Sequence, residues 1–65
     1  MTYTPRAGDL VRDADHELWF VYADDRNPDG LLYAINAHTD PREPGQPVRS
    51  VDTTWGPLRL EYRPA

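Results

Sequence analysis

The sequence contains no cysteine and no lysine, and it has no long hydrophobic run. Without cysteine, neither disulfide bonds nor thiolate metal sites can supplement the core, so stability must come from packing. No apolar run approaches the roughly 18 residues needed to cross a bilayer, and the polar residues that follow Met1 do not resemble a secretory signal. We therefore expect no membrane span and a cytoplasmic location.

The length of the chain limits what it can build. A chain of 65 residues and 7.5 kDa has room for one hydrophobic core. We expect a single domain, 1–65, in which residues 1–7 form an N-terminal arm and residues 8–63 form the folded unit. So small a chain has little material for a deep, water-excluding cleft, which argues against an enzyme. Two tryptophans and four tyrosines would be wasted in a disordered tail, so we expect a folded domain.

The charge of the chain is unbalanced toward acid. Seven basic residues, all arginine, stand against eleven aspartates and glutamates, which gives a net charge of -4. The average field therefore repels phosphate backbones and anionic lipid. Nonspecific binding to nucleic acid is disfavoured.

Turn residues divide the sequence into short extended segments, which predicts an all-β fold. The most β-prone segment is Leu18–Asp24, and the residues that follow it, Asp25–Gly30, suit a tight turn before a partner strand. No α-helix is expected, because apolar residues nowhere recur at helical spacing for more than about two turns. The predicted strands cover residues 9–13, 18–24, 31–38, 47–52 and 58–63, with a turn or a single 3₁₀ turn over 53–57.

Short strands at this spacing predict a small, strongly bent antiparallel barrel. The opening Gly8-Asp9-Leu10-Val11-Arg12-Asp13, the second strand ending Val21-Tyr22-Ala23-Asp24, and the turn before the last strand resemble small SH3-like barrels, the group that includes Tudor and KOW modules. The resemblance covers about residues 8–63 and implies a five-stranded SH3-like antiparallel barrel. It implies no particular ligand, since such barrels serve many unrelated functions.

The central hairpin is apolar on both faces. With the turn as hinge, one natural register places Phe20 opposite Ile35, Tyr22 opposite Tyr33, and Leu18 opposite Ala37. The face of the hairpin that carries these side chains can line the core. A slip of one residue would exchange the two faces, so the sequence leaves open which face is buried.

The second face of the hairpin needs a cover, because a barrel has one interior. In the register above, this face carries Trp19 and Val21 beside Leu32. Either bending strands and long loops cover it within the chain, together with Trp55, or it is an exposed apolar patch of the kind that binds proteins. Tryptophan and tyrosine dominate the energetics of many such contacts.

These observations favour a noncatalytic interaction module that binds a protein partner or a second copy of itself. Its predicted partner-binding residues are Trp19, Val21, Leu32 and Trp55. The alternative is a small nucleic-acid-associated barrel that uses a stripe of Arg49, Arg59 and Arg63 on the last two strands. A third possibility is an acidic decoy or inhibitor that presents Asp13, Asp15, Glu17, Asp24 and Asp25.

No catalytic, metal or cofactor site is predicted. The turn Asp25-Arg26-Asn27-Pro28-Asp29-Gly30 matches the first half of a calcium loop, but Asn36 stands where a bidentate glutamate is needed. His16 and His38 would supply at best half of a tetrahedral zinc site. Residues 41–47 carry a proline at every third position, which suits a polyproline ligand and equally suits a stiff connection.

Overall fold

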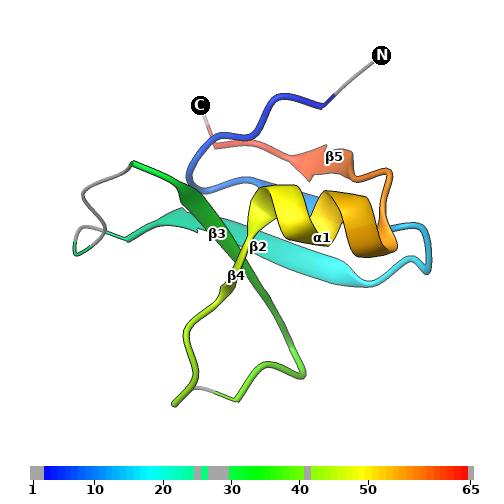
Figure 1. The fold of residues 1–65 in the computed structure, drawn as a ribbon. Coiled ribbons are helices and arrows are strands. Elements are labelled where there is room, and N and C mark those ends of the chain that lie inside the picture. Colours follow the sequence, from blue (N-terminus) through cyan, green and yellow to red (C-terminus); the bar gives the residue numbers. More distant parts are fainter. Residues whose placement is uncertain (1–2, 25, 27–29, 41, 65) are drawn as a thin grey trace.

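Five strands and one helix make up the described part of the chain (Figure 1). A computed structural model describes residues 3–24, 26, 30–40 and 42–64. The elements follow the order β1 (Leu10–Arg12), β2 (Leu18–Ala23), β3 (Leu32–Asn36), β4 (Gln46–Pro47), α1 (Val48–Trp55) and β5 (Arg59–Tyr62). The expected β-rich fold with five antiparallel strands is confirmed.

The strands form one sheet in the order β4-β3-β2-β1-β5. Phe20 pairs with Ile35 and Tyr22 with Tyr33, as the sequence predicts, and the ladder of paired residues ends at Trp19 and Asn36, just short of the predicted pair Leu18 and Ala37. The last strand returns to pair with β1, with an irregularity in register between Leu10 and Val11. Strands β4 and β5 are the two ends of the sheet, so the described strands form an open sheet, and closure into the expected barrel is not confirmed.

Helix α1 contradicts the expectation of an extended segment over 47–52 and a turn over 53–57. It has eight residues and begins directly after Pro47, whose fixed φ suits the entry to a helix. Val48, Val51 and Trp55 recur at intervals of three and four residues, so they share one face, and Val48 and Val51 are buried. The helix is stabilised by this packing, since eight residues are too few for a helix to be stable alone.

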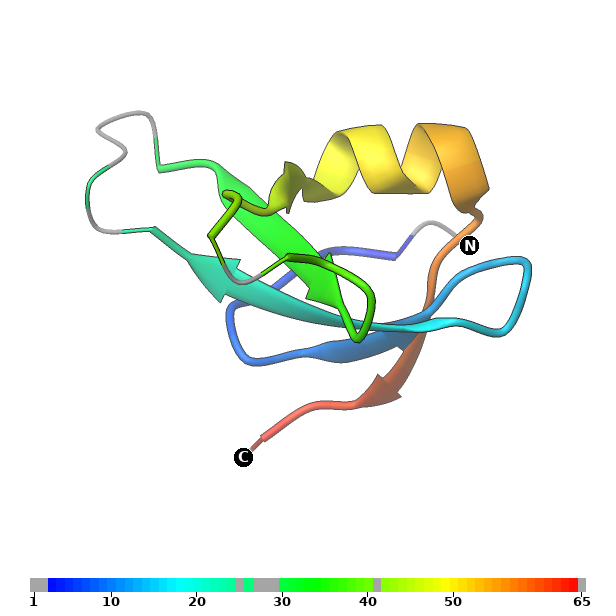
Figure 2. The same ribbon diagram turned by 90° about the horizontal axis from the view of Figure 1, so that it is seen from below.

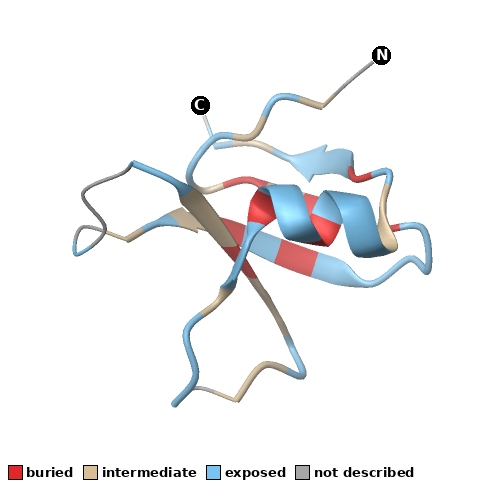
Figure 3. Cartoon of the chain, in the orientation of Figure 1, coloured by how far each residue is buried: buried red, intermediate tan, exposed pale blue. Residues whose placement is uncertain are grey.

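The helix covers one face of the sheet, and the core lies between them (Figure 2). Burial alternates along β2, as expected for a strand with one covered face (Figure 3). The sequence left open which face of the hairpin is buried, and the structure decides it: Trp19 and Val21 are buried, whereas Phe20 is exposed. The buried core residues are Val11, Trp19, Val21, Ala34, Val48, Val51 and Leu58, with Tyr3, Leu32 and Trp55 packed against them.

The buried face of the sheet is the one that helix α1 covers. Trp55 of the helix stacks near Trp19, with ring centroids 5.5 Å apart. The indole Nε1 of Trp19 also donates a hydrogen bond of 2.9 Å to the buried carboxylate of Asp13. An unexpected helix thus supplies apolar surface for Trp19, and a buried carboxylate satisfies its polar atom.

Candidate interaction site

The predicted partner-binding residues lie in or against the core. Trp19 is 3% exposed and Val21 is fully buried, while Leu32 and Trp55 are partly buried and pack against the core. The chain therefore uses these four side chains to hold the helix on the sheet. They do not form the exposed patch that we predicted.

The opposite face of the hairpin keeps exposed apolar side chains. Phe20 on β2 is 42% exposed, and its neighbour Leu18 is 38% exposed. Tyr22, Tyr33 and Ile35 on the same face are half-buried. Exposed phenylalanine beside half-buried aromatic and aliphatic side chains is typical of a surface that contacts another molecule.

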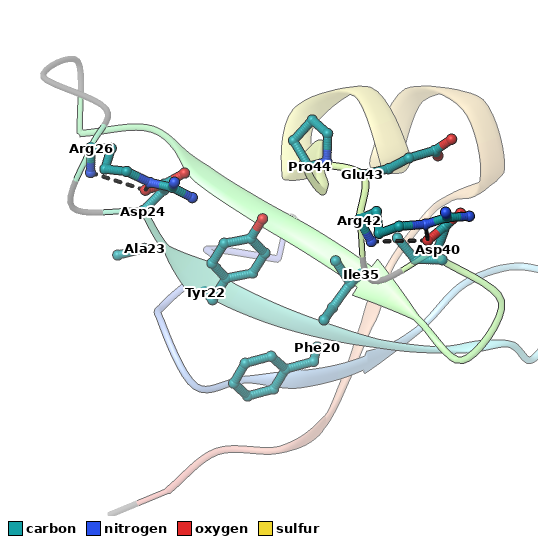
Figure 4. Close-up of a pocket in the computed structure, with 11 residues that line it drawn as sticks. Phe20, Tyr22, Ala23, Asp24, Arg26, Ile35, Asp40, Arg42, Glu43 and Pro44 are labelled. Atoms are coloured by element: carbon teal, nitrogen blue, oxygen red, sulfur yellow. Dashed lines mark hydrogen bonds and ion pairs between the residues drawn. The ribbon is translucent and has the colours of Figure 1, made fainter.

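This face borders an open groove of about 1010 Å³ (Figure 4). Phe20, Tyr22 and Ile35 supply its apolar side chains, and Pro44 adds an apolar contact from the loop between β3 and β4. In Figure 4 the ion pair of Asp24 and Arg26 lies at one end, and that of Asp40 and Arg42 lies at the other. An apolar floor between charged ends is the general form of a site that binds by apolar contact and orients its ligand by polar contact.

The charged ends of the groove are internally neutralised. Arg26 Nε lies 3.4 Å from Asp24 Oδ1, and Arg42 Nη2 lies 3.1 Å from Asp40 Oδ2. Hydrogen bonds from the Arg26 backbone and side chain hold the pKa of Asp24 below its usual value. The Arg42 side chain and backbone do the same for the pKa of Asp40. These carboxylates therefore remain ionised and paired at neutral pH, which leaves them poorly suited to proton transfer.

The loop between β3 and β4 is held against the sheet at Gly45. The Gly45 amide donates a hydrogen bond of 3.0 Å to Tyr22 Oη. A Cβ atom at this position would lie 2.6 Å from that hydroxyl and 2.9 Å from the carbonyl oxygen of Ala34, so the close approach requires glycine. The loop between β3 and β4 thus forms a wall of the groove.

A smaller cleft of about 410 Å³ lies on the other side of this loop and reaches Trp19 and Trp55. Acidic side chains line it, and His38 Nε2 lies 3.8 Å from Glu17 Oε2. Within the residues that the structure describes, no three histidine, aspartate or glutamate side chains are grouped so as to hold a metal ion. The possible calcium ligands Asp25, Asn27 and Asp29 lie outside the described residues.

The three arginines of the predicted stripe do not lie together on the last two strands. Arg49 is exposed on helix α1 and not on a strand, and Arg59 is exposed on β5. Arg63 is engaged in an ion pair with the fully buried Asp9, at 2.9 Å from Nε to Oδ1. Arg63 is therefore a structural residue, and the three arginines do not form one free basic surface.

The sequence did not indicate that two aspartates, Asp9 and Asp13, are buried. Asp9 accepts hydrogen bonds from Tyr3 Oη, the Arg6 amide and Arg63. Asp13 accepts from Trp19 and from the backbone amides of Asp15 and Glu17. Burial alone would raise the pKa of Asp13, but these hydrogen bonds outweigh it and the pKa is lowered. Asp13 is therefore unavailable to the predicted acidic decoy surface.

The geometry of the chain is the basis for any functional argument, because comparison with family models, curated proteins and solved structures gives no match. Within the described part of the chain, no helix has the length and apolar character needed to cross a membrane. The grouping that remains as a candidate site is the groove over Phe20, Tyr22 and Ile35.

Proposed function

We propose that this protein is a noncatalytic binding module whose groove over Phe20, Tyr22 and Ile35 receives an extended segment of a protein partner. The observation that carries the proposal is the exposure of Phe20, which lines the groove and is 42% exposed, on the face of the sheet opposite to the core. Aromatic side chains of this kind commonly anchor protein contacts. The site therefore lies on the face opposite to the one predicted from the sequence.

The form of the groove favours a peptide-like ligand over a compact small molecule. Strands β2 and β3 hold the apolar side chains in a fixed row, since Phe20 pairs with Ile35 and Tyr22 with Tyr33. The two ion pairs lie at opposite ends of this row (Figure 4). An extended segment can place alternate side chains along such a row and its polar groups at the ends.

The finer fold proposed for this module is an SH3-like barrel in which the edge strands β4 and β5 are not paired with each other. The strand order supports it, because four consecutive strands run as antiparallel neighbours and the fifth returns beside the first. The nucleic-acid alternative is weaker, because Arg63 is bound to Asp9 and the net charge is -4.

A random peptide library displayed on phage, selected on the full chain, tests the proposal. We expect enriched peptides to shift the NMR amide signals of β2 and β3, and Phe20→Ser to weaken their binding at least about tenfold. Arg49→Gln, on the exposed side of the helix, is the matched control and should bind as the wild type does. Failure to enrich any peptide, or peptides that shift helix α1 and ignore Phe20→Ser, would count against the groove.

A further inference from the structure

The two ends of the sheet differ in their protection against further strand pairing. Strand β4 has only two residues, and one of them is Pro47, which has no amide to donate. Strand β5 has four residues without proline, and all four are exposed. Among the described residues, no backbone hydrogen bond joins β5 to any segment except β1. The free edge of β5 thus presents unpaired amide and carbonyl groups, to which another strand can bind.

The charges on this edge are unbalanced in a particular way. Arg59 lies directly opposite Arg12 on the neighbouring strand, and like charges in such a position repel. Glu61 compensates Arg12, with Oε2 lying 3.4 Å from its Nε. Among the described residues, Arg59 has no acidic partner. The edge strand therefore carries one cation that lacks a counterion.

A second copy of the same strand can supply that counterion. When two β5 strands pair antiparallel with Leu60 opposite Leu60, each Arg59 lies opposite the Glu61 of the other copy, which makes two ion pairs. Centring the pair on Glu61 would place glutamate against glutamate and arginine against arginine. Centring the pair between Leu60 and Glu61 would place Arg59 opposite Tyr62 and would make no ion pair. Within β5, only the Leu60-centred register places Arg59 opposite a glutamate.

We propose that the β5 edge binds the β5 edge of a second copy of this chain, antiparallel and centred on Leu60, to give a two-fold dimer with one continuous sheet. Leu60, which is 43% exposed, contacts its own counterpart at the centre of the interface. Strands of four residues bury little area, so the dimer is weak, with a dissociation constant of about 10 μM to 1 mM. This edge lies apart from the groove over Phe20, so the inference stands independently of the proposed function.

Sedimentation of the full chain from about 10 μM to about 1 mM, the range of the expected dissociation constant, measures this association. We expect the wild type to dimerise, and Arg59→Glu and Glu61→Arg each to weaken the dimer at least about tenfold, because each places like charges opposite one another twice. An equimolar mixture of the two variants should associate, since every facing pair is then of opposite sign. Arg49→Glu, which makes the same charge change on the helix, should dimerise as the wild type does.

If association depended on net charge and not on the pairing of Arg59 with Glu61, the variants would give a different pattern of results. Glu61→Arg brings the net charge of -4 closer to zero, so a nonspecific charge effect would strengthen association where we expect weakening. Far-ultraviolet circular dichroism on each variant shows that the fold is intact. A wild type that stays monomeric throughout the range overturns the proposal, as does a mixture that associates no better than its components. Loss of peptide binding by Phe20→Ser tests the groove separately.

Discussion

Asp9 is a fully buried carboxylate that ties the N-terminal residues Tyr3 and Arg6 to Arg63, the residue directly after β5. The Arg63 guanidinium lowers the pKa of Asp9 to about 2, against the opposing effect of burial. Hydrogen bonds from Tyr3 and from the Arg6 amide act in the same direction as Arg63. The folded state therefore favours ionised Asp9 more strongly than the unfolded state does, and stability depends on pH.

This lowered pKa predicts a loss of stability in acid. The contribution of Asp9 is fully present above its unfolded pKa of 3.8 and is lost as pH falls through its folded pKa of about 2. We expect about 1–2 kcal/mol to disappear over that interval, since Arg63 is 30% exposed and water screens the pair. Urea titrations at several pH values measure it.

Asp9→Asn and Asp24→Asn separate this buried group from the surface carboxylates. The Asp9→Asn protein should be less stable at neutral pH and should lose less stability between pH 4 and pH 2 than the wild type does. Asp24→Asn, at an ion pair on the surface, should change stability little at neutral pH. Equal acid sensitivity in Asp9→Asn and the wild type would refute the assignment.

Helix α1 is stabilised by its tertiary packing and has poor ends of its own. Its first turn contains no acidic residue, and Pro47 at the N-cap makes no side-chain hydrogen bond to the helix. Arg49 lies in that turn, where a positive charge opposes the partial positive charge of the helix N-terminus. The helix is therefore held on the sheet by the packing of Val48, Val51 and Trp55. Substitution of its surface residues can increase the stability of the protein.

Reversing the charge of Arg49 should stabilise the protein. We expect Arg49→Glu to raise the free energy of unfolding by about 0.3–1 kcal/mol, because a carboxylate in the first turn interacts favourably with the helix dipole. Arg49→Gln, which only removes the charge, should give a smaller gain. Thermal unfolding at low ionic strength measures both, and added salt should reduce the difference. No gain from either variant would mean that the helix terminus is more fully satisfied than its contacts indicate.

The sequence predicted the pairing of β2 with β3 but not the face that they bury. Register follows from the turn residues and from the lengths of the two segments, which are local properties. The choice of face depends on the cover, and the cover is a helix of two turns that falls at the limit of detectable periodicity. The spacing of Val48, Val51 and Trp55 directly after a proline was the available signal for it.

At the scale of the whole molecule, one hydrophobic core lies on one side of an open sheet (Figure 2). The sequence left open whether the second face of the hairpin is covered, and the structure covers one face, with Trp19 and Val21 buried and Phe20 exposed. The sequence could not indicate how far the sheet closes, because barrel closure depends on the bend of long-range strand pairs. The groove is accordingly a consequence of tertiary structure, and its loop wall depends on the contact between Gly45 and Tyr22.

Because one face of the sheet is covered and the other is not, truncating two adjacent residues on β2 should destabilise the protein by unequal amounts. Val21→Ala should destabilise the protein by about 2–3 kcal/mol, since Val21 is fully buried in the core. Phe20→Ala removes a larger side chain but should cost only about 1 kcal/mol, because Phe20 is 42% exposed and loses cross-strand contacts alone. Chemical denaturation compares them directly. A larger cost for Phe20→Ala would show that the outer face is covered in solution.

The contact between Trp19 and Trp55 has an optical consequence. They are the two tryptophans of the chain, one on the sheet and one on the helix, with ring planes tilted by 32°. Indoles at this separation couple their electronic transitions, so near-ultraviolet dichroism and emission colour both report on that single junction. A helix that detached before the strands melted would change these signals while the far-ultraviolet sheet signal persisted. The chain thus carries a built-in spectroscopic probe for whether it unfolds in one step or in two.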